Sequence, residues 1–311
     1  MRKNLSIPAI LLTAALATPA CLGGKFLSRN VAAIGPPRAV PDRISQPAHP
    51  GAGLAVLWVG HATALIQLDD RFILTDPVFT RTVGQLSPRL VEPGVAPDDL
   101  PPIDAVLISH VHFDHLSLGS LEMLERKTRW LGMPRGGLTY LTDFDFPAQE
   151  LGWWQSRELD GGLRVTAVPV QHSGWRYGAD RDWRTGGFTG WVVEYHDMTV
   201  YFGGDTGLAE ERFRATAQRF PDIDLALLPI GPIHPREYHR EMHMDPGEAL
   251  TAFELLGATW MVPIHYDTFA NAVDEPGEAK GVLLELMKQR GYDPQRVAVL
   301  DIGEQRVFIE R

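Results

Sequence analysis

The sequence predicts an α/β protein with two β-sheets and helices on the outside. Short apolar runs typical of strands recur from residue 54 to the end of the chain, and four segments have helical spacing. Several strand-like runs follow one another directly, joined by turns, whereas later ones alternate with helical segments. This order does not fit a simple doubly wound sheet, because too many strands are adjacent in the sequence.

Eleven short segments have the apolar run or the alternation that is typical of β-strands. Asp69-Asp70 and His196-Asp197 each lie between two such segments, so we expect a tight turn at both places. The predicted strands cover residues 54–59, 63–68, 72–75, 104–109, 163–170, 190–195, 198–202, 225–229, 260–264, 297–300 and 307–309.

Apolar residues at helical spacing predict four helices. The third has a clear start signal, because Asp245 can cap the helix, Pro246 takes the first helical position and Glu248 the third. The predicted helices cover residues 118–125, 209–219, 246–256 and 278–290.

Residues 1–20 have the layout of a secretory signal peptide. Arg2 and Lys3 precede an apolar run over residues 7–17, and small residues follow up to Ala20. The apolar run is shorter than the roughly 20 residues that a membrane-spanning helix needs. We therefore expect the chain to be exported from a bacterial cytoplasm.

Cys21 is the only cysteine, and it leaves two routes of processing open. Its position after Ala20 resembles a bacterial lipoprotein cleavage site, in which a lipidated Cys21 would tether the chain to a membrane. Plain cleavage after Ala17 or Ala20 would instead release a periplasmic protein. Residues 21–50 are rich in Gly and Pro and are expected to be a linker. One domain is expected over residues 51–311.

The composition excludes several classes of function. The chain has 39 acidic and 29 basic residues and a net charge of −10, so it has no overall field that would attract a nucleic acid. A single cysteine excludes a disulfide framework within the chain and a Cys-rich zinc module. Any metal chemistry must therefore rest on the 11 histidines and on carboxylates.

Four residues with metal-binding side chains lie within six positions, directly after the apolar run 104–108. His110 and His112 are two residues apart in an extended segment, so they point the same way and can share one metal ion. Asp114 and His115 come after the chain turns and can bind a second ion beside the first. Incidental histidines in a polar loop do not explain this density of titratable groups.

Three more metal-type donors each end an apolar strand: His172, Asp205 and His265. One such residue after a strand is usually an ordinary turn residue. Three of them repeat one geometry, and α/β folds assemble their sites at the carboxyl edges of sheets in this way.

These motifs together resemble the metallo-β-lactamase superfamily. The segment H-x-H-x-D-H at 110–115, followed by His172, Asp205 and His265 in that order, carries the resemblance. Further motifs are similar to the branch that contains N-acyl-phosphatidylethanolamine-hydrolysing phospholipase D and the L-ascorbate-6-phosphate lactonases: Gly60-His-Ala-Thr63, Thr75-Asp-Pro-Val-Phe79, Pro169-Val-Gln-His172, Gly203-Gly-Asp-Thr-Gly207, His243-Met-Asp-Pro246 and Pro263-Ile-His265. The resemblance implies an αβ/βα sandwich of two mixed β-sheets with outer helices, and a two-metal site at one edge between the sheets.

The resemblance also implies a role for each of the seven donors. His110, His112 and His172 would bind one ion, Asp114, His115 and His265 the other, and Asp205 would bridge them. These donors suit Zn²⁺, with Fe or Mn as alternatives. Two such ions can share a water molecule and lower its pKa, so that hydroxide is present near neutral pH.

Other residues are expected to support this site. Asp76 is expected to accept a hydrogen bond from a ligating imidazole, or else to be a turn aspartate before proline. His61 is expected to support the site or to fill a turn. His243 is expected to contact a substrate oxygen or to protonate a leaving group, so His243 and Asp114 are assigned as catalytic.

The loop over residues 173–188 is expected to bind substrate. Trp175 and Tyr177 would supply apolar walls, and Arg176 would clamp a phosphate or a carboxylate. Tyr266, next to a predicted ligand, is assigned to the same role. The loop also contains Arg181, Trp183 and Arg184.

The sequence thus predicts a metal-dependent hydrolase whose two metal ions activate a hydroxide. Its expected substrate is a phosphodiester, as for a phospholipase D, or a related ester in a small molecule or a lipid. One alternative is a lactonase or carboxylic-ester hydrolase acting on a small anionic substrate. Another, from a different class, is a non-catalytic exported protein that binds metal or ligand.

Overall fold

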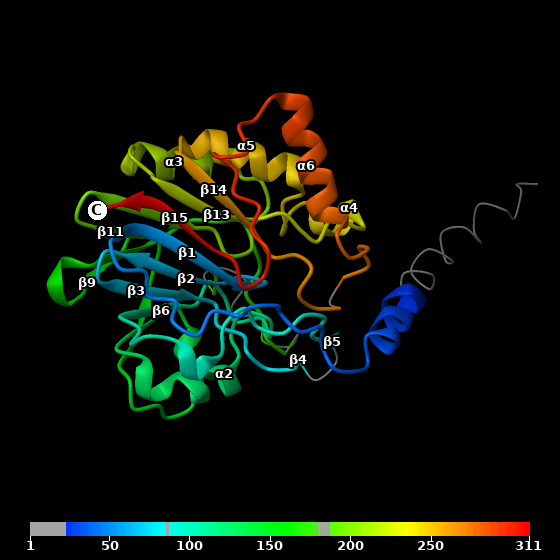
Figure 1. Cartoon of the computed structure of the whole chain (residues 1–311), viewed down its shortest axis with the longest axis horizontal. Helices are drawn as coiled ribbons and strands as arrows, with labels where there is room; N and C mark the ends of the chain where they lie inside the picture. The colour runs from blue at the N-terminus through cyan, green and yellow to red at the C-terminus, as the bar shows by residue number, and fades with distance from the viewer. Residues whose placement is uncertain (1–22, 85–86, 178–179, 181–186, 271) are drawn as a thin grey trace, which may run out of the picture.

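The computed structural model of the chain describes residues 23–84, 87–177, 180, 187–270 and 272–311, to which all structural statements below refer. Two mixed β-sheets lie in the middle of the molecule, with α2 on one side and α3, α5 and α6 on the other (Figure 1). This is the αβ/βα sandwich that the resemblance to the metallo-β-lactamase superfamily implies. The predicted signal peptide over residues 1–20, Cys21, Arg181, Trp183 and Arg184 lie outside the described residues.

The first sheet has seven strands in the order β15-β1-β2-β3-β6-β7-β8. Its first four strands pair antiparallel, and β3, β6, β7 and β8 pair parallel. The strands are β15 (Gln305–Glu310), β1 (Ala52–Gly60), β2 (Thr63–Leu68), β3 (Arg71–Thr75), β6 (Ala105–Leu107), β7 (Leu131–Pro134) and β8 (Ala148–Leu151).

The second sheet has six strands in the order β14-β13-β12-β11-β10-β9. Here β14, β13 and β12 pair parallel, and the others pair antiparallel. The strands are β14 (Trp260–Ile264), β13 (Leu225–Pro229), β12 (Met198–Phe202), β11 (Gly190–Tyr195), β10 (Arg164–Val168) and β9 (Ser156–Glu158). A short pair, β4 (Thr82–Val83) and β5 (Ser87–Pro88), lies apart from both sheets.

The α-helices are α2 (Leu118–Leu124), α3 (Glu210–Arg219), α4 (Arg236–His239), α5 (Pro246–Leu256) and α6 (Glu278–Arg290), and short 3-10 helices are η1 (Pro97–Asp99), η2 (Glu125–Lys127), η3 (Gly137–Tyr140) and η4 (Asp160–Gly162). The capping box predicted for α5 is present: Asp245 accepts from the Glu248 amide at 2.9 Å, and Glu248 accepts from the Asp245 amide at 3.2 Å. A cap of this kind stabilises a protein by about 1 kcal/mol.

Strand β1 contributes to two apolar layers at once. Leu54, Val56 and Trp58 belong to the core between the two sheets, whereas Leu57 and Val59 belong to the core that packs on α2. Successive side chains of a strand point to opposite faces, so a strand that is covered on both faces stays apolar along its length. This central position explains why all nine residues of β1 are buried.

The predicted strand over residues 297–300 is not a strand. Val297 forms only an isolated bridge with Met261, and the chain then turns, because the Leu300 amide donates to Ala298. The sequence reading also misses β7, β8 and β9. These segments are short, and β7 contains Gly132 and Pro134, so their sequences have only a weak strand pattern. They form strands because they pair with neighbouring strands in the sheets.

The segment expected to be a linker contains a helix over residues 23–32. Arg29 on this helix pairs with Glu275, with 2.8 Å between Nη2 and Oε2. Further along, the His49 amide donates to the side chain of Gln67, and the Gln67 amide group donates to the His49 carbonyl, both at 2.9 Å. The described part of this segment therefore packs on the domain, because specific polar contacts hold it there.

None of the helices in the described part of the chain is both long enough and apolar enough to cross a membrane.

Candidate metal centre

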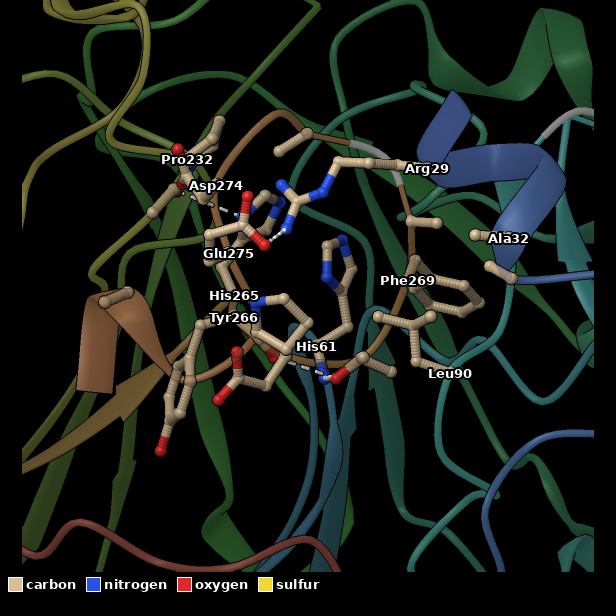
Figure 2. Close-up of a pocket in the computed structure, with 18 residues that line it drawn as sticks. Arg29, Ala32, His61, Leu90, Pro232, His265, Tyr266, Phe269, Asp274 and Glu275 are labelled. Carbon is tan, nitrogen blue, oxygen red and sulfur yellow. Dashed lines mark hydrogen bonds and ion pairs between the residues drawn. The ribbon is translucent and has the colours of Figure 1, made fainter. Parts of the chain in front are cut away.

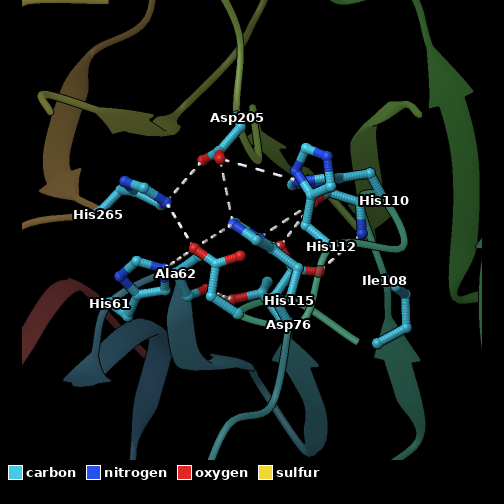
Figure 3. A network of polar contacts seen from close by, with 12 residues as sticks. His61, Ala62, Asp76, Ile108, His110, His112, His115, Asp205 and His265 are labelled. Atoms are coloured by element: carbon cyan, nitrogen blue, oxygen red, sulfur yellow. Dashed lines mark hydrogen bonds and ion pairs between the residues drawn. The ribbon is translucent and has the colours of Figure 1, made fainter. Parts of the chain in front are cut away.

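Residues from both sheets meet at one edge of the sandwich (Figure 3). Parallel strands place their carboxyl ends together, and the first residues after such strands commonly form the site of an α/β fold. The residues that meet here are His61 in the turn after β1, Asp76 after β3, the segment 109–116 after β6, His172 after β10, Asp205 after β12 and His265 after β14.

The first cluster consists of three imidazoles. Nε2 of His110 lies 2.8 Å from Nδ1 of His112 and 3.1 Å from Nε2 of His172, and the latter two atoms are 3.3 Å apart. The ligand atoms of a tetrahedral zinc ion are about 3.4 Å apart, given Zn–N distances near 2.1 Å. The three nitrogens are therefore spaced as the ligands of one metal ion.

The second cluster contains Asp114, His115 and His265, together with His61. Oδ2 of Asp114 lies 3.8 Å from Nε2 of His115, 3.7 Å from Nε2 of His265 and 3.0 Å from Nε2 of His61. His61 was predicted to support the site, and its Nε2 lies within hydrogen-bond distance of Asp114 Oδ2. His61 therefore supports this side of the site through its contact with the Asp114 carboxylate.

Asp205 lies between the two clusters. Its Oδ1 is 3.1 Å from His265 Nε2, and its Oδ2 is 3.2 Å from His115 Nε2. The same Oδ2 is 3.9 Å from Nε2 of both His110 and His172 in the first cluster. The carboxylate of Asp205 therefore faces both clusters, and all seven donors named from the sequence come together here.

The buried polar atoms of the site fit metal ions. Burying a polar atom without a partner costs free energy, and buried polar groups are therefore normally paired. Four buried atoms face the centre of the site without a hydrogen bond of good geometry among the described residues, although Asp205 lies within ion-pair distance of the three imidazoles: His115 Nε2, His265 Nε2, His243 Nδ1 and Asp205 Oδ1. A divalent cation would satisfy such a set of nitrogen and oxygen donors.

The electrostatics of the site also favour cations. Burial raises the pKa of the Asp205 carboxyl, but His115 and His265 outweigh burial and hold it well below its usual value. Burial lowers the pKa of His265, yet Asp205 and Asp114 raise it to about 9. Two buried carboxylates thus draw protons onto neighbouring imidazoles, and metal ions would supply that positive charge instead.

The outer nitrogens of the imidazoles are held by hydrogen bonds. Nδ1–H of His115 donates to Asp76 Oδ2 at 2.6 Å. Nδ1–H of His172 donates to the Met242 carbonyl at 2.9 Å, and Nδ1–H of His265 donates to the Gly231 carbonyl at 3.1 Å. Because a neutral imidazole carries one proton, each of these bonds leaves Nε2 free to bind metal.

The backbone is unusual at three residues of the site. His61, Asp76 and His265 have φ values of 56°, 32° and 66°, in the left-handed region that side chains other than glycine rarely adopt. Gly204 is also left-handed, and a Cβ there would lie 2.3 Å from Ser109 Cβ. Such conformations concentrate at functional sites, because the surrounding structure must hold them in place.

Arg176, which was predicted to clamp a substrate anion, lines a pocket beside the two clusters, but its Nη1 is already bound to backbone carbonyls. Its Nη1 donates to the carbonyls of Val111 and Leu116, at 2.8 and 2.9 Å, and its guanidinium lies 4.2 Å from the centre of the Phe113 ring. The side chain is buried. Arg176 therefore ties together Val111 and Leu116, between which lie three of the seven predicted metal ligands: His112, Asp114 and His115.

The other three residues that were predicted to bind substrate lie at different places relative to the two clusters. Trp175 is 40% exposed and its ring centre lies 5.2 Å from that of His112, so it borders the site. Tyr177 is exposed and packs edge-on against Phe113, outside the lining of the pocket. Tyr266 stacks on Trp58 and donates its hydroxyl to the Leu300 carbonyl, and it lines a second pocket together with His61 and His265.

A pocket of about 380 Å³ opens onto the two clusters. Besides metal-type donors, it is lined by Trp175 and by Phe26 from the helix over residues 23–32. His243 also lines it, with Nδ1 at 3.6 Å from Asp205 Oδ2. Burial lowers the pKa of His243 well below its usual value, so the imidazole is neutral.

His239 and Phe26 also line this pocket, and neither is among the site residues predicted from the sequence. His239 lines it, and the His243 amide donates to the His239 carbonyl at 2.7 Å, one helical turn away. The four-residue spacing of these histidines was the signal available in the sequence. Phe26 has no comparable signal, because it lies in the segment that reads as a linker.

The family described as Beta-lactamase superfamily domain matches residues 71–266 of this chain. N-acyl-phosphatidylethanolamine-hydrolyzing phospholipase D 1 of Caenorhabditis elegans is 32% identical over 276 residues, which cover 82% of this chain and 76% of that protein. A UPF0173 metal-dependent hydrolase of Methanopyrus kandleri is 30% identical over 259 residues, which cover 81% of this chain and 98% of that protein.

The solved structure of Igni18, a metallo hydrolase from Ignicoccus hospitalis, superposes on this chain with a TM-score of 0.60 and 25% identity. The match covers 83% of this chain and 99% of that structure. The family match over residues 71–266 includes the segment 109–116, His172, Asp205 and His265.

Proposed function

This chain belongs to the beta-lactamase superfamily, and on that basis we propose that it hydrolyses a phosphodiester bond at a centre of two metal ions. Its activity as a metal-dependent hydrolase follows from the family and from the relatives. The phosphodiester substrate and the number of ions are our proposal.

The position of Asp205 carries the proposal. Its two carboxylate oxygens face His265 and His115 at 3.1 and 3.2 Å, and one of them also faces His110 at 3.9 Å. A carboxylate so placed suits a bridge between two ions. When bound, two ions lower the pKa of a shared water molecule and polarise a phosphoryl oxygen.

The nitrogen and oxygen donors favour Zn²⁺ as the resident metal. Imidazoles and carboxylates are ordinary zinc ligands, and the chain offers no thiolate in the described domain that would favour a softer metal. We propose that His110, His112 and His172 hold one ion, and that Asp114, His115 and His265 hold the other.

We assign Asp114 and His243 to the proposed reaction. Asp114 accepts a hydrogen bond from His61 Nε2 at 3.0 Å, which fixes the carboxylate that would hold the second ion. The neutral imidazole of His243 lines the pocket beside Asp205, so we assign it to donate a hydrogen bond to a substrate oxygen. Trp175 would form an apolar wall next to that oxygen.

The choice of a phosphodiester rests on the relative from C. elegans, whose name states a phospholipase D activity on an N-acyl phospholipid. The pocket agrees with a substrate that is partly apolar, because Phe26, Phe113 and Trp175 line it next to the metal-type donors. A phosphoryl oxygen would face the donors, and an apolar group would contact the aromatic side chains.

The test is hydrolysis by purified, zinc-loaded protein. Bis-p-nitrophenyl phosphate, a γ-lactone and an N-acyl phospholipid would be assayed in parallel, and we expect turnover of the two phosphodiesters. His112→Ala should abolish this turnover, whereas His196→Ala, an exposed histidine paired with Asp69, should not change it. Turnover of the lactone alone, or no turnover with both ions bound, would contradict the proposal.

We also propose that the chain is exported and processed next to Cys21. The support is the signal-like composition of residues 1–20. Mass spectrometry of the mature N-terminus from the producing cell would distinguish a lipidated Cys21 from an unmodified one. An intact Met1 on the mature protein would contradict export by this route.

A further inference from the structure

Another group of metal-type donors lies outside the metal centre, and we call it the outer site. It consists of His234 in the loop after β13, Asp274, and Glu278, the first residue of α6. Each residue offers one ligand atom, and the three atoms lie within 4.8 Å of one another. Two ligands on opposite sides of one ion are about 4–5 Å apart, because metal–ligand distances are about 2.0–2.4 Å. The three atoms can therefore bind one cation together.

Backbone amides hold the two carboxylates of the outer site in place. Asp274 accepts the amides of Ile233 and His234, at 2.6 and 2.8 Å. Oε2 of Glu278 accepts the Glu275 amide at 2.7 Å, and its Oε1 lies 3.0 Å from Nε2 of His234. Each carboxylate oxygen has a second lone pair for a cation. Because the side chains are already ordered, binding a cation would cost little conformational entropy.

The negative charge of the outer site has no permanent counter-charge. Among the described residues, no Lys or Arg lies within ion-pair distance of Asp274 or Glu278, and Glu278 pairs with His234 alone. Lys25 and Arg29 pair instead with Glu275, at 3.5 and 2.8 Å (Figure 2). A neutral His234 leaves two carboxylates uncompensated, and a divalent cation would balance them.

A second exposed pair of a histidine and a carboxylate shows the difference. Nδ1 of His196 lies 2.7 Å from Oδ2 of Asp69, but Arg311 Nε also lies 2.9 Å from Oδ1 of that carboxylate. The guanidinium already supplies a positive charge there and would repel a metal ion. His196 is therefore a matched control for His234.

The outer site lies directly behind the wall of the metal centre. The loop that carries His234 begins with Gly231, whose carbonyl accepts Nδ1–H of His265 at 3.1 Å. Pro232 of this loop lines the pocket at the metal centre and also a second pocket, of about 370 Å³, which Asp274 lines too (Figure 2). An ion at the outer site would therefore cross-link two remote segments, 231–234 and 274–278, that support His265.

We propose that His234, Asp274 and Glu278 bind one divalent cation in addition to the ions of the metal centre. An imidazole with two carboxylates suits Zn²⁺ or Mn²⁺. The His234 side chain is 52% exposed, so water molecules complete the coordination and the ion exchanges with solvent. Its role is to fasten the loop behind His265 to the start of α6. This site is independent of the reaction that the metal centre catalyses.

The first experiment counts the ions. Zn²⁺ would be titrated into untagged full-length protein against a chromophoric chelator, and we expect one ion per chain that binds more weakly than those of the centre. His234→Ala and Glu278→Gln should each weaken this ion at least about tenfold, because each removes a ligand. His196→Ala should leave it unchanged. Absence of the weaker ion, or its full retention in both His234→Ala and Glu278→Gln, would overturn the proposal.

Asp205→Asn separates the outer site from the metal centre. The carboxylate of Asp205 faces the two clusters of the centre and is not part of the outer site. Titration of this variant should therefore still show the weaker ion, even if the centre is empty or the protein hydrolyses no phosphodiester. Loss of the weaker ion in Asp205→Asn but not in His234→Ala would assign that ion to the centre and refute the outer site.

Hydrogen exchange measured by mass spectrometry tests the fastening role. With the centre already loaded, further Zn²⁺ should slow exchange in peptides that contain residues 231–234 and 274–278. The same addition should have no such effect in His234→Ala, whose thermal unfolding would show that the fold is retained. Equal protection of these peptides in the unmodified protein and in His234→Ala, or no protection in either, would contradict the cross-link.

Discussion

Oδ2 of Asp76 lies 2.6 Å from Nδ1 of His115, and both side chains are completely buried. The Asp76 carboxylate also accepts the amide and the hydroxyl of Ser109, each at 2.6 Å. His115 is thereby held with Nε2 towards Asp205. Asp76 does not face the centre of the site, yet it fixes the orientation of a residue that does.

We therefore expect Asp76→Asn to weaken metal binding. Loss of a carboxylate that orients a ligating histidine typically costs about 10–100-fold in metal affinity or activity. Metal titration with a competing chelator would measure the change. Asp104→Asn is a matched control. Asp104 is also a buried aspartate, and it accepts hydrogen bonds from the Phe72 amide and from Arg129. It lies just before β6, whereas the predicted metal ligands follow that strand. Equal losses in both variants would show that Asp76 acts only through stability.

Asp205→Asn should affect both proposed ions, because the carboxylate of Asp205 faces both clusters. His112→Ala should affect one ion, because His112 contacts only His110 and His172 among the proposed donors. The measurement is metal content per chain by elemental analysis after dialysis. We expect nearly complete loss for Asp205→Asn and loss of about one ion for His112→Ala. One ion retained at full affinity in Asp205→Asn would contradict a bridging role.

The metal-free protein should be most stable near pH 6.5. Burial lowers the pKa of His172 to about 3. Below pH 6.5 His172 is therefore protonated in the unfolded chain but not in the folded chain, so the free energy of unfolding decreases as the pH falls. At His265 burial is outweighed by Asp205 and Asp114, which raise the pKa to about 9. Between pH 6.5 and 9 the folded chain keeps a proton that the unfolded chain loses, so stability falls there too.

Thermal unfolding of the chelator-treated protein across this pH range would measure the effect. In the zinc-loaded protein the alkaline decrease should disappear, because the metal ion replaces the proton on His265. A metal-free protein whose Tm stays constant between pH 6.5 and 9 would contradict the assigned charge of His265.

Arg176→Met should destabilise the ligand loop. The change removes two buried hydrogen bonds and leaves the carbonyls of Val111 and Leu116 without this donor. Leaving a buried acceptor unsatisfied costs about 1–3 kcal/mol. We expect a lower Tm and a weaker affinity for the second ion, measured by unfolding and by metal titration. If Arg176→Met raised KM for anionic substrates with no change in Tm, the clamp expected from the sequence would be right after all.

Trp175→Ala should raise KM for phosphodiester substrates several-fold, because Trp175 borders both the pocket and His112. Tyr177→Ala should have little effect, since Tyr177 is exposed and lies outside the pocket lining. Steady-state kinetics with bis-p-nitrophenyl phosphate would compare the two variants. Equal effects would show that the loop acts as a unit rather than through Trp175.

The metal-type donors were predictable because each leaves a local signal. His110, His112, Asp114 and His115 are packed into six positions after an apolar strand, and His172, Asp205 and His265 follow other apolar strands. Burial on both faces makes such strands apolar along their length, so a polar metal-type residue at their end is conspicuous.

The roles of Arg176 and Tyr266 were not predictable, because their partners are distant in the sequence. Arg176 bonds carbonyls 60 and 65 residues away, and Tyr266 bonds a carbonyl 34 residues away. The residue type alone does not distinguish an arginine that binds a phosphate from one that binds backbone carbonyls. Only packing decides between them.

Apolar periodicity and the spacing of histidines and carboxylates predicted two sheets with outer helices and a metal site, because both are local properties of the chain. The resemblance to the metallo-β-lactamase superfamily added the sandwich and the role of each ligand. Tertiary structure alone decided that His61 lies against Asp114, that Arg176 holds the ligand loop, and that the helix over residues 23–32 borders two pockets. The reason is physical: a cavity exists only between segments that are remote along the chain, so no local pattern records it.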